Sequence, residues 1–257
     1  MTSSETYDAI VNAGEAKCCM DYHALKAKSM LAGAFIAIGC MMMLLVKSDS
    51  TLSPAVSSIL SGLCFSAGLF SVFVCESELF TGDCLMVFGL IEGKYTVGCM
   101  FLTLLAVLAY NFVGVVAMVT LFNASGMQNS LRDGILAVES AKMALRMPEL
   151  FAKSVLCNFM VCLAAWINAK SASVTEKLVA AVVPVTVFVA LGFEHSVANA
   201  FFYLLMPENG FLLVEMLSVC ILGNVVGGML LFGVTQAVAS VNWKKNWDLV
   251  DEKHGQA

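Results

Sequence analysis

Charge is scarce in this sequence. Only 13% of its 257 residues are charged, while 60% are hydrophobic and the mean hydropathy is +0.86. An average soluble domain is about 25% charged, and a globular core of this length could not bury so large an apolar excess. The composition excludes a disordered chain, because so apolar a chain would not stay solvated. It also argues against a soluble enzyme, and the net charge of -5 without a basic cluster argues against a nucleic-acid binder. The class that remains is a polytopic membrane protein.

Long uncharged runs mark the membrane spans. A bilayer core about 30 Å thick is crossed by about 20 mostly apolar helical residues. The runs of this kind are Ser29–Val46, Ala55–Cys75, Tyr95–Phe122, Ser154–Ala169, Leu178–Phe193 and Phe211–Val241, the last with one charged residue, Glu215, near its start. They lack the strict alternation of a β-barrel strand. The predicted fold class is therefore all-α, a polytopic membrane protein with six transmembrane helices.

The distribution of basic residues predicts the orientation in the membrane. With an even number of spans, both termini lie on one side, and the side richer in Lys and Arg is cytoplasmic. Nine basic residues share the side of the N-terminus and five lie on the other, so both termini are predicted to be cytoplasmic in the cell membrane. One channel domain is predicted over 1–257. Its parts are a cytoplasmic N-terminal segment 1–28, a first repeat 29–122, an external connection 123–153, a second repeat 154–241 and a cytoplasmic tail 242–257.

The two halves of the chain carry corresponding landmarks in the same order. The matching pairs are Ala27–Leu31 with Ala152–Leu156, Glu78–Thr81 with Glu194–Ser196, and Asn111–Gly114 with Asn224–Gly227. Because each half has three spans, an odd number, the second half must start on the opposite face of the membrane. The pattern predicts two inverted three-helix repeats, an arrangement typical of transporters and channels.

The second and fifth spans are predicted to be broken. Ala55 to Ile91 would form about 55 Å of continuous helix, too long for one crossing, and the polar stretch Cys75–Asp83 interrupts it. Gly192–Asn199 interrupts the fifth span in the same way. Irregular backbone at membrane depth is tolerated where it lines a cavity. Each break therefore predicts a helix, a covered loop and a short half-helix.

Polar residues in the two breaks are the candidate site. An ionisable group at membrane depth marks a pathway by default, so His195 is predicted to lie in a pore and to meet Thr81 of the other half. The alternative is a neutral histidine that only bonds the opposing loop. Glu78, Glu194 and Asn199 are predicted to stabilise the loops, the carboxylates by accepting backbone N–H bonds.

Ten cysteines raise the question of redox or metal chemistry. Most lie inside apolar runs, and the sequence has no CxxC motif. A buried cysteine usually behaves as a small hydrophobic residue, so we predict no metal and no cofactor. An intramembrane thiol or redox protein using Cys75, Cys84, Cys157 or Cys162 stays open as the alternative function.

Three motifs together resemble the formate/nitrite transporter family, which includes a hydrosulfide channel branch. They are Ser77–Gly82, Gly192–Asn199 and Gly223–Gly228, and the resemblance extends from Lys17 to about Val241. It implies an aquaporin-like six-helix protomer with its own pore, assembled as a homopentamer in the lipid bilayer.

The resemblance also implies roles for individual residues. It places Thr81, Asn158 and His195 at the polar centre of the pore. Phe65, Leu69 and Phe80 match one apolar constriction, Phe188 matches the other, and Leu79 is also expected at a constriction. Lys17 and Lys142 match lysines that attract anions into the vestibules.

The predicted function is transport of a small monovalent anion, not catalysis. Desolvation of a bare anion in a dry constriction costs several kcal/mol of free energy even after relaxation. Stabilisation or transient protonation of the anion at His195 would offset this cost. Formate, nitrite and hydrosulfide are all small conjugate bases of weak acids, so the sequence does not separate them. Simple conduction and proton-coupled symport stay open for the same reason.

Overall fold

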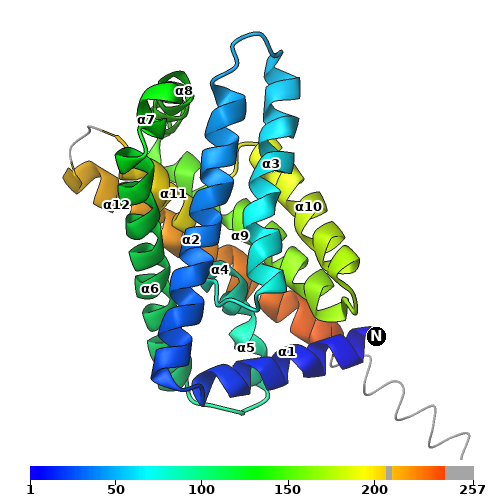
Figure 1. Cartoon of the computed structure of the whole chain (residues 1–257). Helices are drawn as coiled ribbons and strands as arrows, with labels where there is room; N and C mark the ends of the chain where they lie inside the picture. The colour runs from blue at the N-terminus through cyan, green and yellow to red at the C-terminus, as the bar shows by residue number, and fades with distance from the viewer. Residues whose placement is uncertain (207–209, 241–257) are drawn as a thin grey trace, which may run out of the picture.

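The computed structural model describes residues 1–206 and 210–240, and all regular structure in these two ranges is helical. Figure 1 shows an upright helical bundle with α1 lying across one end. The helices are α1 (Ser3–Cys18), α2 (Tyr22–Lys47), α3 (Pro54–Val74), α4 (Phe80–Asp83), η1 (Cys84–Met86), α5 (Val87–Ile91), α6 (Val97–Ala124), α7 (Met127–Ser130), α8 (Arg132–Met143), α9 (Met147–Lys170), α10 (Val174–Ala190), α11 (Ser196–Tyr203), α12 (Gly210–Val225) and the π-helix η2 (Val226–Val234). The predicted tail 242–257 lies outside the described residues.

Within residues 1–206 and 210–240, five helices are long and apolar enough to cross a membrane, namely α2, α3, α6, α9 and the continuous stretch Gly210–Ser240. They coincide with five of the six predicted spans. The sixth, predicted over Leu178–Phe193, is α10, which has 17 residues. Large apolar side chains are exposed on α6 and α10, for example Phe101 and Val183. Such a surface suits contact with lipid or with a neighbouring subunit.

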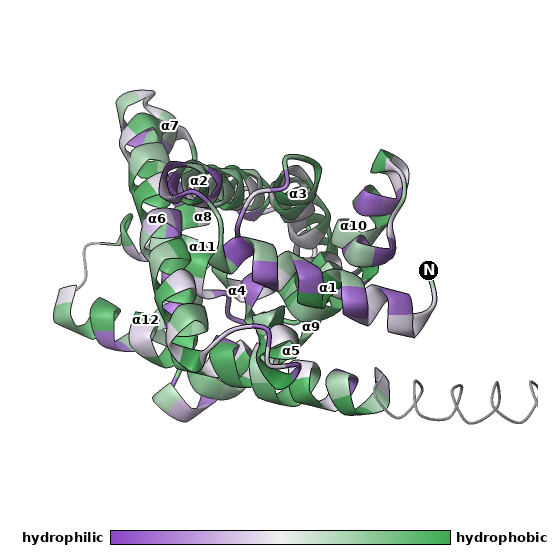
Figure 2. Ribbon diagram, turned by 90° about the horizontal axis from the view of Figure 1, so that it is seen from below, coloured by the Kyte–Doolittle hydropathy of each residue, from purple (hydrophilic) through white to green (hydrophobic). Residues whose placement is uncertain are grey.

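Helix packing follows the predicted repeats. α2 packs on α3 and α6 in the first half, α9 packs on α10 and α12 in the second, and α3 packs on α10 between the halves. α1 and α8 lie at opposite ends of the bundle (Figure 1). Seen from the α1 end, hydrophilic residues of α1 lie over a bundle of mostly hydrophobic helices (Figure 2).

The breaks after α3 and α10 have the same backbone geometry. Gly192 adopts a left-handed φ of 68°, and Glu76 adopts φ 50° at the corresponding place. The N–H of the next residue then bonds back to the last turn of the helix, from Ser77 to Val72 at 3.0 Å and from Phe193 to Phe188 at 2.9 Å. This Schellman pattern ends a helix cleanly. The predicted interruptions of the second and fifth spans are confirmed.

A buried asparagine holds the first loop. The Asn111 side-chain oxygen accepts the Phe80 N–H at 3.0 Å. Its amide nitrogen donates to the carbonyl oxygens of Ser29 at 2.8 Å and Glu78 at 2.9 Å. One side chain therefore ties α2, the loop and the start of α4 to α6.

Asn224 makes the matching set of bonds in the second half. Its oxygen accepts the Ser196 N–H at 2.9 Å, and its nitrogen donates to the carbonyl oxygens of Ser154 at 2.8 Å and Glu194 at 3.0 Å. The predicted correspondence of the two halves is thus present at the level of single hydrogen bonds. It positions the starts of α4 and α11, where the site lies.

Candidate functional site

The centre of the site is a buried contact between the two halves. Thr81 Oγ1 lies 2.9 Å from His195 Nε2, and both side chains are buried. The predicted meeting of these residues is confirmed. His195 also caps α11, since its Nδ1 accepts the Ala198 N–H at 3.2 Å. A ring nitrogen that accepts an N–H bond carries no hydrogen, so the neutral ring has its proton on Nε2, facing Thr81.

Two half-helices begin beside this contact. Thr81 lies in the first turn of the helical stretch formed by α4, η1 and α5, and His195 caps α11. The N-terminal end of a helix carries partial positive charge. Discontinuous helices in transporters often direct such ends at anionic groups. The centre thus combines two hydrogen-bonding side chains with two helix N-termini, whose partial positive charge favours an anion.

A cavity of about 250 Å³ approaches the centre from the α8 end. His195, Phe65 and Phe188 line it together. The Phe65 and Phe188 rings meet edge to face, with centroids 5.9 Å apart, and Phe188 is stacked on His195 at 6.2 Å. An aromatic pair therefore lines this cavity directly beside the histidine.

A larger cavity of about 500 Å³ lies at the α1 end and is lined by Leu69 and Leu79. The resemblance grouped Phe65, Leu69 and Phe80 in one constriction, and the structure groups them differently. Phe65 belongs with Phe188 in the other cavity. Phe80 packs in a hydrophobic cluster with residues of α6, because its backbone is held by Asn111 of that helix. Of the residues predicted for the constrictions, Leu69 and Leu79 are the ones that line the cavity at the α1 end.

The lysine at the α1 end is held by carboxylates. Lys17 Nζ lies 2.7 Å from Glu78 Oε2 and also contacts Asp83 Oδ1. Burial lowers the pKa of Lys17, but Asp83 and Glu78 together raise it by more, so the ammonium stays protonated. The prediction that Glu78 accepts loop N–H bonds is corrected, since Lys17 occupies its carboxylate and Asn111 secures the loop.

The lysine at the α8 end has matching partners. Lys142 Nζ lies 2.6 Å from Glu194 Oε2 and 2.7 Å from Asn199 Oδ1. Glu194 therefore holds a lysine rather than the predicted backbone N–H, and Asn224 secures this loop. Asn199 connects Lys142 to Tyr203, whose hydroxyl lies 3.4 Å from the amide nitrogen.

Asn158 lies beside the centre. Its amide nitrogen donates to the Asn224 carbonyl oxygen at 2.7 Å and contacts Cys84 Sγ at 3.3 Å. Cys162 Sγ lies 3.5 Å from the Thr81 carbonyl oxygen and 4.0 Å from Asn158 Oδ1. Sequence reasoning missed this link, although Cys162 follows Asn158 by one helical turn and must share its face.

The comparisons with known proteins decide the family. The family model described as "Formate/nitrite transporter" matches residues 4–238. The chain belongs to the formate/nitrite transporter family. "Formate channel FocB" of Escherichia coli (strain K12) is 34% identical over 177 residues, covering 67% of this chain and 63% of that protein, which is less than two thirds of its length. "Formate channel FocA" of the same strain is 30% identical over 274 residues, covering 91% of this chain and 96% of that protein.

Solved structures share the fold. One described as "FNT family ion channel" matches with a TM-score of 0.81 at 26% identity, covering 91% of this chain and 98% of that one. Another, "Pentameric formate channel with formate bound", matches with a TM-score of 0.72 at 24% identity, covering 85% and 97%. The predicted family and all-α fold class are confirmed. As a member of the formate/nitrite transporter family, the chain is a multi-pass membrane protein of the channel class.

In this member of the formate/nitrite transporter family, the buried thiols act as small packing groups. The Sγ atoms of Cys84 and Cys162 lie 3.5 Å from backbone carbonyl oxygens of α4. Cys157 is also buried, whereas Cys75 is exposed at the end of α3. Across residues 1–206 and 210–240, no group of three or more His, Cys, Asp or Glu side chains could hold a metal ion. Together with the family, these contacts do not favour the thiol or redox alternative.

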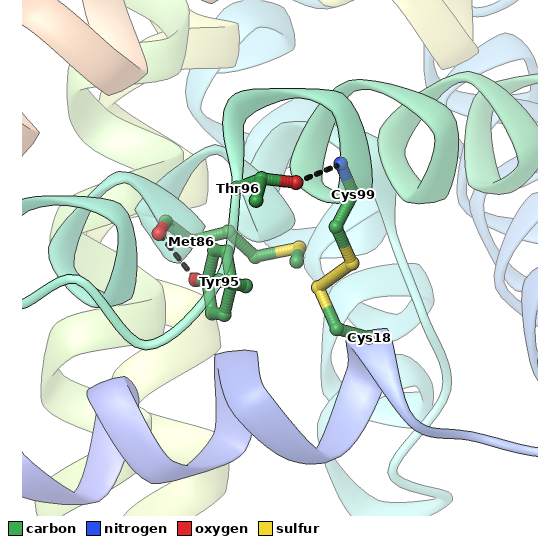
Figure 3. Close-up of a disulfide and its surroundings, with 5 residues drawn as sticks. All are labelled: Cys18, Met86, Tyr95, Thr96 and Cys99. Carbon is green, nitrogen blue, oxygen red and sulfur yellow. Dashed lines mark hydrogen bonds between the residues drawn. A yellow bond between two sulfur atoms is a disulfide. The ribbon is translucent and has the colours of Figure 1, made fainter.

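One disulfide was not predicted. Cys18, the last residue of α1, bonds to Cys99 in the first turn of the transporter's helix α6, with Cα atoms 6.2 Å apart (Figure 3). Sequence reasoning placed Cys99 inside an apolar run, but it lies at the exposed start of the helix, where the Thr96 hydroxyl caps its N–H at 3.2 Å. Beside it, the Tyr95 hydroxyl donates to the Met86 carbonyl oxygen. The bond fixes α1 beside the turn that follows α5.

Proposed function

We propose that this protein conducts small monovalent anions of weak acids, such as formate, nitrite or hydrosulfide, across the cell membrane. The observation that carries the proposal is the Thr81–His195 contact, buried between two cavities that each contain lysines. The relatives named as formate channels support the choice of substrate class. The crossing step takes place where the two halves of the chain meet.

The ring proton of His195 suggests how the anion crosses. Nε2–H faces Thr81, so the centre presents a hydrogen-bond donor next to a hydroxyl that can turn toward the anion. These donors replace part of the hydration that the anion leaves behind. Either the hydrogen-bonded anion moves on, or it takes up a proton from the water of the adjoining cavity. In the second case it crosses Leu79 on one side and Phe188 on the other as the neutral acid.

Lysines at both ends are proposed to attract the anion. Lys17 lies in the cavity at the α1 end and Lys142 in the cavity at the α8 end. Lys142 is partly neutralised by Glu194, but Lys47 and Lys153 line the same cavity and add positive charge. Charges of one sign in a cleft raise the local concentration of an oppositely charged substrate.

We further propose a homopentamer in which each protomer contains its own pore. The support is the fold shared with a structure described as pentameric and the apolar side chains exposed on α6 and α10. Both termini are proposed to be cytoplasmic, which places α1 at the inner end and α8 at the outer end. The predicted domain division, from the N-terminal segment 1–28 through the repeats 29–122 and 154–241, is retained in this proposal.

A liposome flux assay tests the function. Formate, nitrite and hydrosulfide should pass in the presence of the protein, whereas chloride and glycerol should not. An imposed proton gradient that drives uptake would show coupled symport, and flux unaffected by it would show simple conduction. Equal flux of glycerol, or anion flux no faster than in empty liposomes, would contradict the proposal. Alkylation of the cysteines that leaves flux intact would remove the thiol alternative.

A further inference from the structure

The two ends of the molecule carry matching polar sets that differ at one position. Lys17 contacts Glu78 and Asp83, whereas Lys142 contacts Glu194 and Asn199. Each second-half partner stands at the same distance along the chain from its first-half counterpart, since Glu194 follows Glu78, and Asn199 follows Asp83, by 116 residues. The position that carries an amide at the α8 end thus carries a carboxylate at the α1 end.

The difference changes the charge of the set. One ammonium faces one carboxylate at the α8 end, which sums to zero. At the α1 end one ammonium faces two carboxylates, which sums to a net charge of one negative unit when both are ionised. Because Glu78 and Asp83 contact the same Lys17 nitrogen, their oxygens lie close together. Two carboxylates that share a site do not both ionise readily.

A second observation concerns one oxygen atom. Asp83 is only 4% exposed, and Lys17 engages its Oδ1. Its Oδ2 is buried and has no hydrogen-bond partner among the described residues. A buried carboxylate oxygen without a donor is costly, and a proton on the carboxylate would remove that cost.

Among the described residues, the other charged groups at this cavity form no ion pair with Glu78 or Asp83. The further titratable residues that line it are Lys28 of α2, Lys177 of α10 and Glu76 of the loop. Lys177 Nζ donates to the neutral Phe73 carbonyl oxygen at 3.1 Å, and it forms no ion pair with the two carboxylates. The Tyr95 hydroxyl nearby donates to the Met86 carbonyl oxygen, and Lys94 pairs with Glu15 at 3.6 Å. Cys84 follows Asp83 directly and is buried.

We propose that Lys17, Glu78 and Asp83 form a proton-binding site at the α1 end of the pore, with no counterpart at the α8 end. The site takes one proton from the solution on its own side, a carboxylate oxygen becomes O–H, and the charge of the set changes from one negative unit to zero. The effect on flux rests on the proposed anion transport. When both carboxylates are ionised, their charge outweighs the attraction of Lys17 for the anion. Protonation of one of them restores this attraction, so entry from the α1 end rises as the pH on that side falls.

Infrared spectroscopy tests proton binding without transport. Purified protein in lipid, brought from about pH 8 to about pH 5, should gain the carbonyl band of a protonated carboxylic acid. The band should be absent in Asp83→Asn and Glu78→Gln, two variants of different partners of Lys17. Asn199→Asp, the mirror change, should add such a band. Wild-type and Asp83→Asn spectra with the same bands would overturn the site.

Formate flux tests the consequence. The orientation of the protein in the liposomes is measured on a parallel sample by labelling the exposed Cys19 with a membrane-impermeant maleimide. The pH on each side of the membrane is set separately. Lowering the pH at the α1 end should increase formate entry in the wild type by a factor about two to six times larger than in Asp83→Asn. This is the expected effect of removing one unit charge at roughly 4–8 Å from the anion in water. The comparison between variants cancels titration of formate itself.

The mirror variant completes the design. Asn199→Asp should acquire a similar pH dependence at the α8 end while keeping the wild-type behaviour at the α1 end. Equal pH dependence of wild type and Asp83→Asn at the α1 end would overturn the effect on flux. Wild-type protein that shows the infrared band but conducts no anion would contradict the proposed function and leave the proton site supported.

Discussion

The His195 ring makes two hydrogen bonds, and together they determine where its proton points. Nδ1 is used by the start of α11, which leaves Nε2–H for the contact with Thr81. The residue in the corresponding place of the first half is Leu79, because 116 positions separate the two, as they separate Glu78 from Glu194. The polar centre is therefore built by unlike residues on otherwise matching loops.

Substitution of His195 should separate a functional from a structural role. His195→Phe should abolish anion flux in a protein that still inserts and assembles, because the donor at the centre is lost. His195→Asn keeps a donor without a titrating ring, so it should conduct and lose the pH dependence caused by the ring, while keeping the one that Asp83 causes at the α1 end. Oligomer yield and pH-dependent flux are measured on the same samples. Wild-type flux per assembled His195→Phe protein would rule out the functional role.

Thr81 should matter through its hydroxyl. Thr81→Val keeps the shape and leaves the buried His195 nitrogen without its partner at 2.9 Å, a loss of about 1–3 kcal/mol. Flux should fall about tenfold or more, since about 1.4 kcal/mol is a factor of ten. Thr81→Ser is the matched control and should stay near the wild type. Equal flux of the Val and Ser variants would mean that the hydroxyl takes no part in crossing.

At the scale of elements, the breaks could be predicted because a polar run inside a long apolar segment is costly in lipid unless it lines a cavity. Their backbone geometry could be predicted in one half only. Gly192 indicates a left-handed residue, whereas Glu76 has the same conformation without a glycine to mark it. Helix α8 was missed because a 12-residue amphipathic helix within a connection carries no span-length apolar run.

Opposite substitutions at the two left-handed positions, Gly192 and Glu76, should have opposite effects on stability. Gly192→Ala places a side chain at φ 68° and should lower the free energy of unfolding by about 1–2 kcal/mol. Glu76→Gly relieves the same cost at φ 50° and should leave the stability unchanged or higher. Glu76→Gln controls for the lost charge, because it keeps the strained conformation. Thermal unfolding of the three variants in detergent gives the ranking, and a Gly192→Ala protein as stable as the wild type would contradict the argument.

Across the whole molecule, contacts between distant residues account for most of what the sequence could not predict. The pairing of Thr81 with His195 followed from the repeat, because corresponding loops of inverted halves meet in the middle. The partners of Lys17 and Lys142 did not, since both glutamates were expected to serve their own loops. Local pattern indicates which groups need a partner, but only the packing of α1 and α8 against the bundle determines which partner each one finds.

The attachment of α1 is the last such contact. Lys17 binds two carboxylates, the Tyr7 hydroxyl donates to Glu92 at 3.0 Å, and the Cys18–Cys99 disulfide joins residues 81 positions apart. Because the spans between these cysteines remain inserted, loss of the disulfide should weaken the docking of α1 rather than unfold the protein. A disulfide typically contributes about 2–4 kcal/mol.

Hydrogen exchange over residues 3–18 measures this docking directly. Reduction, or Cys18→Ser, should speed exchange in α1 about tenfold or more, since about 1.4 kcal/mol corresponds to a factor of ten. Cys19→Ser is the matched control, because Cys19 is a free, exposed thiol next to the bonded one, and it should exchange like the oxidised wild type. Exchange in the spans should not change in any variant. If α1 exchanges at one rate in oxidised, reduced and Cys18→Ser protein, its docking rests on Lys17 and Tyr7 and the disulfide contributes nothing to it.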